Sequence, residues 1–260
     1  MRHITVKKLD SELNLQFLTC VRGNLKWFLK ETLEKKGEFS LVEVIWHGHA
    51  CFELRGKKAS VVIDPFEGLG IPEPEANAEI VLCSHSHRDH NNFAPVLKNG
   101  GTVLEGFVGS REVSGVSIKG TATFHDVVGG GQRGNNSIYV VHLDDVRFCH
   151  LGDLGHDLNK EHIAEIGEID VLLTPVGGGP TIGPKIASSI VEKMDPRIVV
   201  PMHYNAEVPG QKDWMNTRLH KVDTFLSSVE GVVERLDSRS FTITKENISK
   251  SREIKVLTLT

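Results

Sequence analysis

The chain has 260 residues, 39% hydrophobic and 25% charged, which is typical of a globular protein with one large domain or two small ones. Its formal net charge of −4 argues against a nucleic-acid binder, which usually carries a basic surplus. No apolar run reaches the roughly 18 residues of a membrane span, and residues 1–16 lack the apolar core of a signal peptide.

Residues 11–36 carry apolar side chains at roughly helical spacing, and Gly37 follows the pattern. We therefore predict an N-terminal helical extension over residues 1–40, ahead of a main domain over 41–260. Three interpretations of the extension remain: an added helical layer, a cover over part of a cleft, or a contact in a homo-oligomer. Trp27 and Phe28 would anchor such a contact, although core packing is the simpler role for both.

From residue 41 the sequence changes to short apolar runs bounded by turn residues, which is typical of strands. We predict strands at 41–46, 51–55, 59–64, 79–84, 101–107, 116–124, 136–143 and 146–152, with a short helix around 93–99. Beyond residue 158, predicted helices at 159–167, 185–194 and 217–229 alternate with strands at 170–176, 197–204, 232–237 and 241–246. Such alternation suggests sheets covered by helices. Two sheets packed face to face, with helices outside, would bury these apolar runs.

The four cysteines suggest a reducing compartment. Cys20, Cys51, Cys83 and Cys149 show no CxxC spacing, and the last three lie inside apolar runs. Buried reduced thiols explain this distribution better than disulfides do, because disulfides are rare in the cytoplasm. We predict a cytoplasmic protein.

Directly after the predicted strand at 79–84, the chain places His85, His87, Asp89 and His90 within six positions. Side chains alternate along a strand, so the first two histidines can point the same way. One loop cannot easily wrap a single ion with all four groups, whereas two adjacent ions can use them as two pairs. Neutral imidazole and carboxylate suit zinc, and also manganese or iron. A solvated helix cap is the alternative, and the spacing favours the metal site.

Two stretches carry a family resemblance. HSHRDH at 85–90 resembles the HxHxDH motif of the metallo-β-lactamase superfamily. The stretches VIWHGHACFEL and ASVVIDPF are similar to the opening of one branch, which includes L-ascorbate-6-phosphate lactonases and N-acylphosphatidylethanolamine-hydrolysing phospholipases D. The resemblance covers roughly residues 41–240 and implies an α/β fold, the four-layer αβ/βα sandwich of that superfamily.

The resemblance implies further metal ligands, and each has a candidate at the end of an apolar run: His125, Asp153 and His203. In the family's scheme the ligands of the first metal are His85, His87 and His125. Those of the second metal are Asp89, His90 and His203. Asp153 would bridge the two ions, a hydroxide between them would be the nucleophile, and Asp89 would orient that nucleophile or shuttle its proton.

Two glycine-rich loops, at 127–136 and 175–184, follow predicted strands. They are either flexible turns or linings of the metal cleft, where backbone must come close to a substrate. In the first loop Arg133 is a candidate for binding a phosphate or carboxylate. His156 is a candidate for substrate contact or proton donation. His150 is a weaker ligand candidate than His125. Of His47 and His49, the second is the better candidate for a supporting role, because it belongs to the GHA motif.

The sequence therefore predicts a binuclear metal-dependent hydrolase that acts on a small molecule, with Asp89 and Asp153 as catalytic residues. Zinc is the expected metal, with manganese or iron as alternatives. The branch resemblance favours a lactone or a phosphodiester as substrate. Two other functions stay open: a metal-binding regulatory module without catalysis, and a di-iron redox protein on the same fold. The redox relatives usually carry glutamate where His87 stands.

Overall fold

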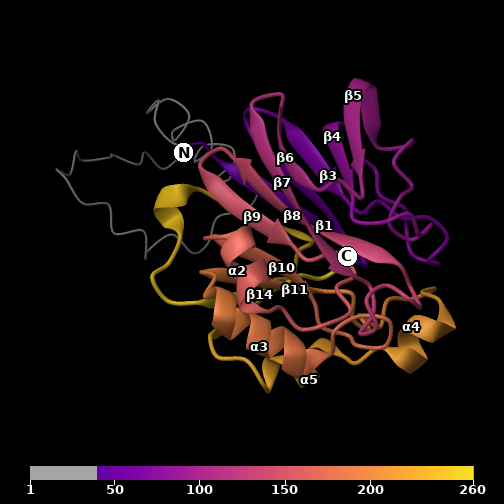
Figure 1. Cartoon of the computed structure of the whole chain (residues 1–260). Coiled ribbons are helices and arrows are strands. Elements are labelled where there is room, and N and C mark those ends of the chain that lie inside the picture. The colour runs from indigo at the N-terminus through magenta and orange to yellow at the C-terminus, as the bar shows by residue number, and fades with distance from the viewer. Residues whose placement is uncertain (1–39, 260) are drawn as a thin grey trace, which may run out of the picture. The chain divides into compact units, whose positions relative to one another are not determined.

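The computed structural model describes residues 40–259 and folds them around two β-sheets (Figure 1). The first sheet has the strand order β13 (Ser240–Ile243), β1 (Val42–Gly48), β2 (Cys51–Arg55), β3 (Ser60–Ile63), β4 (Ala78–Cys83) and β5 (Leu97–Glu105). The second has the order β12 (Val232–Arg235), β14 (Glu253–Val256), β11 (Ile198–Met202), β10 (Val171–Pro175), β9 (Val146–His150), β8 (Asn135–Leu143), β7 (Val116–Phe124) and β6 (Gly109–Val113).

A shared hydrophobic core joins the two sheets. Phe52 and Leu54 of β2 contribute to it from the first sheet, and Tyr139 and Phe148 contribute from the second. All four side chains are fully buried, and each such burial is worth roughly 1.5–3 kcal/mol relative to exposure. Most of the described strands therefore pack as one body, which fixes the loops at their ends relative to one another.

Helices cover the outer face of the second sheet. They are α2 (Lys160–Ile166), α3 (Pro184–Met194) and α5 (Val222–Leu226), which lie on one side of that sheet in Figure 1. Helix α3 begins with a proline in its first turn and ends at Asp195 in the left-handed conformation. Its residues Ala187, Ile190 and Val191 are buried. Two packed sheets with this helical layer form the predicted metallo-β-lactamase fold.

The outer face of the first sheet has its own hydrophobic cluster. Val62 and Val81 of the sheet pack there with Phe66 and Leu69 of the loop over residues 65–77. Part of this loop is therefore packed against the sheet. Helix α4 (Asp213–Arg218) adds Met215 to the same cluster.

The helix predicted around 93–99 is wrong. Residues 94–96 form a turn, and Leu97 begins strand β5, which pairs in parallel with β4. The segment lacks the length for stable helix formation, so pairing with a distant strand decides its conformation. Strands β6 and β14 were not predicted, because each is too short and too polar to form a clear apolar run. Pairing with β7 holds β6 in the sheet, and pairing with β11 and β12 holds β14.

The single helix predicted over 217–229 is instead split into α4 and α5, with Leu219 extended between them. Leu219 is buried in the cluster on the first sheet, whereas Val222 and Phe225 belong to the main core. One straight helix cannot bury both groups.

A short 3₁₀ helix over Lys245–Asn247 follows β13.

Three outcomes complete the comparison with the sequence. Cys51, Cys83 and Cys149 are free and buried, as predicted. Cys20 and the N-terminal extension, including Trp27 and Phe28, lie outside the described residues. Among the helices of residues 40–259, none is long and apolar enough to cross a membrane.

Candidate metal centre

The candidate ligands converge because strand ends converge. Asp64 follows β3, His85 follows β4, His125 follows β7, Asp153 follows β9 and His203 follows β11. Neighbouring strands of the two sheets run in parallel at β3–β4 and at β9–β10–β11, so their carboxyl ends lie at the same edge. The strand ends that the sequence predicted as sources of ligands thus meet in one place.

One group of imidazoles consists of His85, His87 and His125, with one ring nitrogen of each within 4.8 Å of the others. These are the ligands predicted for the first metal. The closest pair is His85 Nε2 and His87 Nδ1, at 2.9 Å. His87 is exposed while the other two are buried, so this group faces solvent on the His87 side.

A second group consists of His49, His90 and His203, again with ring nitrogens within 4.8 Å of one another. The sequence predicted Asp89, His90 and His203 for the second metal. Asp89 lies beside this group, with Oδ2 at 3.6 Å from His49 Nε2. His49 therefore lies within this group of imidazoles, whereas the sequence predicted only a supporting role for it.

The carboxylate of Asp153 lies between the two groups. Its Oδ2 is 3.2 Å from His125 Nε2 and 3.2 Å from His90 Nε2. Its Oδ1 is 3.5 Å from His203 Nε2. One buried side chain thus contacts imidazoles that come from both groups and from both sheets.

Asp64 orients the imidazoles of the first sheet, a role that the sequence did not reveal. Its Oδ2 lies 3.0 Å from His90 Nδ1 and accepts a hydrogen bond of 2.8 Å from the Ser84 hydroxyl. That hydroxyl lies 2.9 Å from His85 Nδ1 and can accept its proton. Both histidines then present Nε2 to the centre. The only available signal was the position of Asp64 in ASVVIDPF.

Asn136 holds the loop that carries Asp153. Its Oδ1 accepts from the Asp153 backbone N–H at 2.9 Å, and its Nδ2 donates to Leu151 O at 3.0 Å and Thr123 Oγ1 at 2.8 Å. A side chain at Gly152, whose φ is +58°, would collide with Asn136 Oδ1. The amide therefore connects the loop after β9 with β7, the strand that leads to His125.

Burial lowers the pKa of three imidazoles in the two groups. It lowers the pKa of His85 to about 3. Burial and the neighbouring His203 lower the pKa of His49 to about 4. Burial also lowers the pKa of His87. Metal ligation needs an unprotonated ring nitrogen, so this environment prepares the three rings for it.

Two groups have pKa values shifted toward their charged forms. Burial alone would lower the pKa of His90, but Asp153 and Asp64 raise it well above its ordinary value. Burial would raise the pKa of Asp153, but His203 and His90 hold it well below its ordinary value. The two carboxylates around His90 therefore favour a positive charge at this point, which a bound metal ion would supply once the ring is unprotonated.

The donor set fits divalent metal ions. Several buried polar atoms have no hydrogen-bond partner among the described residues: both ring nitrogens of His49 and His203, His90 Nε2, His125 Nδ1 and Asp153 Oδ1. Burying such atoms without a partner costs free energy, and a bound metal ion would give them one. Imidazole nitrogens with carboxylate oxygens suit zinc, and also manganese or iron.

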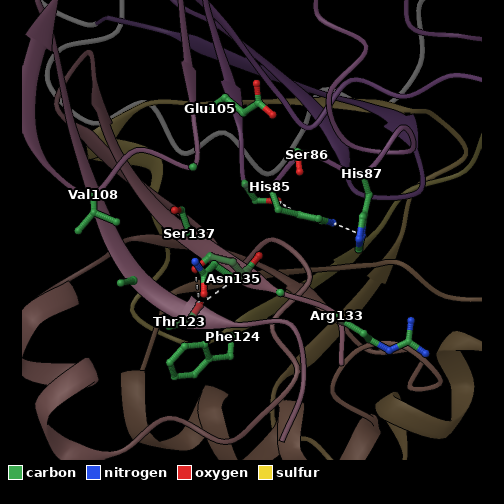
Figure 2. A pocket seen from close by; sticks show the side chains of 15 residues that line it. His85, Ser86, His87, Glu105, Val108, Thr123, Phe124, Arg133, Asn135 and Ser137 are labelled. Carbon is green, nitrogen blue, oxygen red and sulfur yellow. Dashed lines mark hydrogen bonds between the residues drawn. The ribbon is translucent and has the colours of Figure 1, made fainter. Parts of the chain in front are cut away.

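The two predicted substrate-binding residues differ in placement. Arg133 lines a cavity together with His85 and His87 (Figure 2). His156 is not among the residues that line it. Its Nε2 accepts from the Phe124 backbone N–H at 3.2 Å, and its Nδ1 lies 2.8 Å from Asp157 O. Both ring nitrogens of His156 therefore bind backbone.

His150 is bound by backbone as well. Its Nε2 lies 2.8 Å from Ala50 O, and its Nδ1 accepts from the Gly152 N–H at 3.0 Å. This agrees with the preference for His125 over His150 as a ligand candidate. The glycine-rich loop at 175–184 also has a packing role, because a side chain at Gly177 would collide with the backbone oxygen of His203.

The other glycine-rich loop is held by Asp126. The side chain of this residue accepts hydrogen bonds from the backbone N–H groups of four loop residues: Val128, Gly130, Gln132 and Arg133. Burial opposes ionisation, but these four donors lower the pKa of Asp126 to about 2. The loop therefore has a defined shape beside His125.

The comparison with protein families identifies the superfamily of the chain. The family model of the beta-lactamase superfamily domain matches residues 43–203, from the first strand to the last candidate ligand. This chain belongs to the metallo-β-lactamase superfamily. A UPF0173 metal-dependent hydrolase of Thermococcus onnurineus is 35% identical over 201 residues, which cover 66% of this chain and 89% of the relative. One from Pyrococcus horikoshii is 34% identical over 202 residues, with the same coverage.

Solved structures agree with this assignment. A crystal structure from Thermotoga maritima, described as a zinc-dependent hydrolase of the superfamily, shares 35% identity. Its TM-score is 0.69, and the match covers 84% of this chain and all of that one. A metallo-hydrolase of Ignicoccus hospitalis shares the fold with a TM-score of 0.53 and 21% identity. The chain is thus a metal-dependent hydrolase, which argues against the redox and regulatory alternatives. The specific branch predicted from the sequence stays a prediction.

Proposed function

We propose that the chain is a binuclear hydrolase that opens a lactone or cleaves a phosphodiester of a small molecule. The observation that carries this proposal is the position of Asp153. Its carboxylate contacts imidazoles of two separate groups, and its Oδ1 has no hydrogen-bond partner among the described residues. A carboxylate with this placement can bridge two adjacent ions.

The proposed ligands follow the two imidazole groups. His85, His87 and His125 would hold the first ion. His90 and His203 would hold the second together with Asp89, and His49 is the neighbour that orients Asp89. Two bound divalent ions would supply a hydroxide near neutral pH and would polarise the scissile bond. Zinc is the proposed metal, with manganese or iron as alternatives.

Asp89 is suited to proton transfer. Its side chain is 31% exposed, whereas that of Asp153 is 3% exposed, so Asp89 can reach solvent. Burial would raise its pKa, but the contact with His49 and the nearby His90 hold it below its ordinary value. We propose that ionised Asp89 orients the attacking water and accepts its proton.

The chain also offers a group for substrate recognition. Arg133 lines the cavity beside the first imidazole group. A guanidinium binds phosphate or carboxylate through two parallel hydrogen bonds. This favours an anionic substrate, and the net charge of −4 favours a small molecule over nucleic acid. A cytoplasmic location and self-association through residues 1–40 stay predictions.

A two-substrate comparison tests the proposed chemistry. The purified protein would be loaded with zinc or manganese and assayed for opening of a γ-lactone and for cleavage of bis(p-nitrophenyl) phosphate. Turnover of one substrate that is lost in Asp153→Asn would support the proposal and select the substrate class. Turnover that survives this substitution would contradict the role of Asp153.

A further inference from the structure

A cavity of about 490 Å³ opens beside the first imidazole group. Its lining comes from the loop after β4, the β5–β6 turn, and strands β7 and β8. Figure 2 shows His85 and His87 toward one end, and Val108 on the opposite side. The volume lies within the roughly 300–1,000 Å³ of typical small-molecule sites.

The cavity has an apolar rim away from the histidines. Val108 is 52% exposed and Phe124 is 40% exposed, and both line it. Val127 and Val128 are also exposed and sit on the loop that follows His125. Only six large hydrophobic side chains are exposed within residues 40–259, and four of them gather on these adjoining segments. Contiguous exposed apolar groups commonly mark a binding surface.

Polar groups line the rest of the cavity. In Figure 2, Arg133 and His87 lie on the side away from Val108, Asn135 and Ser137 lie between, and Glu105 lies opposite Phe124. The cavity thus combines a reaction end, an anion-binding group and an apolar end. A substrate that spans it needs a hydrolysable, anionic part joined to an apolar arm.

We propose that the cavity binds the apolar alkyl or aryl arm of the substrate, with the arm against Val108 and Phe124. This inference rests on the proposed function, because the hydrolysable bond is placed at His85 and His87. It narrows the substrate class to amphipathic molecules with a carboxylic or phosphoric ester-type bond. Binding of a second protein to the apolar rim is the competing explanation, and the test distinguishes it.

Fatty carboxylates serve as probes, because each is the acid product of such a hydrolysis. Titration calorimetry would compare butanoate with octanoate on the full-length protein, with metal content measured on the same sample. Each buried CH₂ is worth about 0.8 kcal/mol, so four half-buried groups predict roughly tenfold tighter binding of octanoate. Equal affinities for the two acids would overturn the proposal and leave the rim to a protein partner.

Val108→Ser is the informative variant, because Val108 lies in the β5–β6 turn and is not one of the candidate ligands, and serine removes apolar surface without adding charge. It should reduce the chain-length gain and leave butanoate binding unchanged. Val232→Ser is the matched control, since Val232 is 62% exposed on β12, away from the cavity. A gain that survives Val108→Ser in full would place octanoate elsewhere and contradict the proposal. A sample that binds no metal yet keeps the gain would refute the proposed function alone.

Discussion

At the scale of single residues, the centre depends on carboxylates and amides that hold imidazoles in place. The Asp64 carboxylate contacts His90 Nδ1 directly. It also reaches His85 through the Ser84 hydroxyl, which lies between the two side chains. Asn136 fixes the backbone at Asp153. Such outer partners set which ring nitrogen faces a metal, so their loss weakens metal binding without removing a ligand. Two substitutions separate these contributions.

Asp153→Asn keeps the shape of the side chain but removes its charge. We expect loss of one metal ion per chain and at least a roughly hundredfold fall in activity, because removal of a bridging ligand exceeds the 10–100-fold effect of outer partners. Metal content by elemental analysis and rates of hydrolysis measure both effects. A variant that keeps two ions at unchanged affinity would refute the bridging role.

Asn136→Ala removes three hydrogen bonds that connect Asp153, Leu151 and Thr123. We expect metal affinity to fall by about 10–100-fold while both ions still bind at saturation. Competition with a chromophoric chelator measures the affinity. Asn77→Ala, in the exposed part of the loop before β4, is the control and should leave it unchanged.

At the scale of elements, the loops at strand ends carry the candidate site residues, and the sheets position those loops. The glycine-rich loop over 127–136 illustrates this, since one carboxylate, Asp126, organises four of its backbone N–H groups. The pKa of Asp126 is lowered from 3.8 to about 2. Its contribution to loop order is therefore present above pH 3.8 and is lost as the pH falls through about 2.

Asp126→Ala should release this loop. We expect amide hydrogen exchange at Val128, Gly130, Gln132 and Arg133 to accelerate by roughly tenfold or more, since those donors lose their acceptor. Asp145→Ala, in the exposed β8–β9 turn, should leave exchange in this loop unchanged. Unchanged protection in Asp126→Ala would show that the loop keeps its shape without the carboxylate.

The sequence predicted most elements of the fold, because apolar runs such as those of β4, β9 and β11 are local patterns. The HxHxDH motif indicated His85, His87, Asp89 and His90, and the family resemblance indicated His125, Asp153 and His203. The structure brings these residues close together, and their role as ligands stays a prediction. Other features depend on partners that are distant in sequence. Leu97 is in a strand because β4 offers an edge, and His49 joins His90 and His203 only after the two sheets pack. No local pattern distinguishes such residues.

At the scale of the molecule, the proposed ions connect the two sheets. His85, His87 and His90 come from the end of a strand in the first sheet. His125, Asp153 and His203 come from strand ends in the second. Metal bound by these residues would therefore stabilise the packing of one sheet on the other, in addition to its chemistry.

Removal of metal should lower the thermal stability of the whole domain. A ligand at about 1,000 times its dissociation constant stabilises the folded state by about 4 kcal/mol. For a domain of this size, about 2–4 °C of Tm per kcal/mol predicts a decrease of roughly 10 °C on chelation. Calorimetry with and without a chelator measures the shift, and an unchanged Tm would separate metal binding from sheet packing.

The central claim is that this chain binds two metal ions in one centre, and metal content per chain tests it most directly. Protein purified without added metal would be examined by elemental analysis and then titrated with zinc and manganese. We predict close to two zinc or manganese ions per chain, whereas two irons would favour the redox alternative. A chain that contains no metal and takes up none on titration would contradict the account.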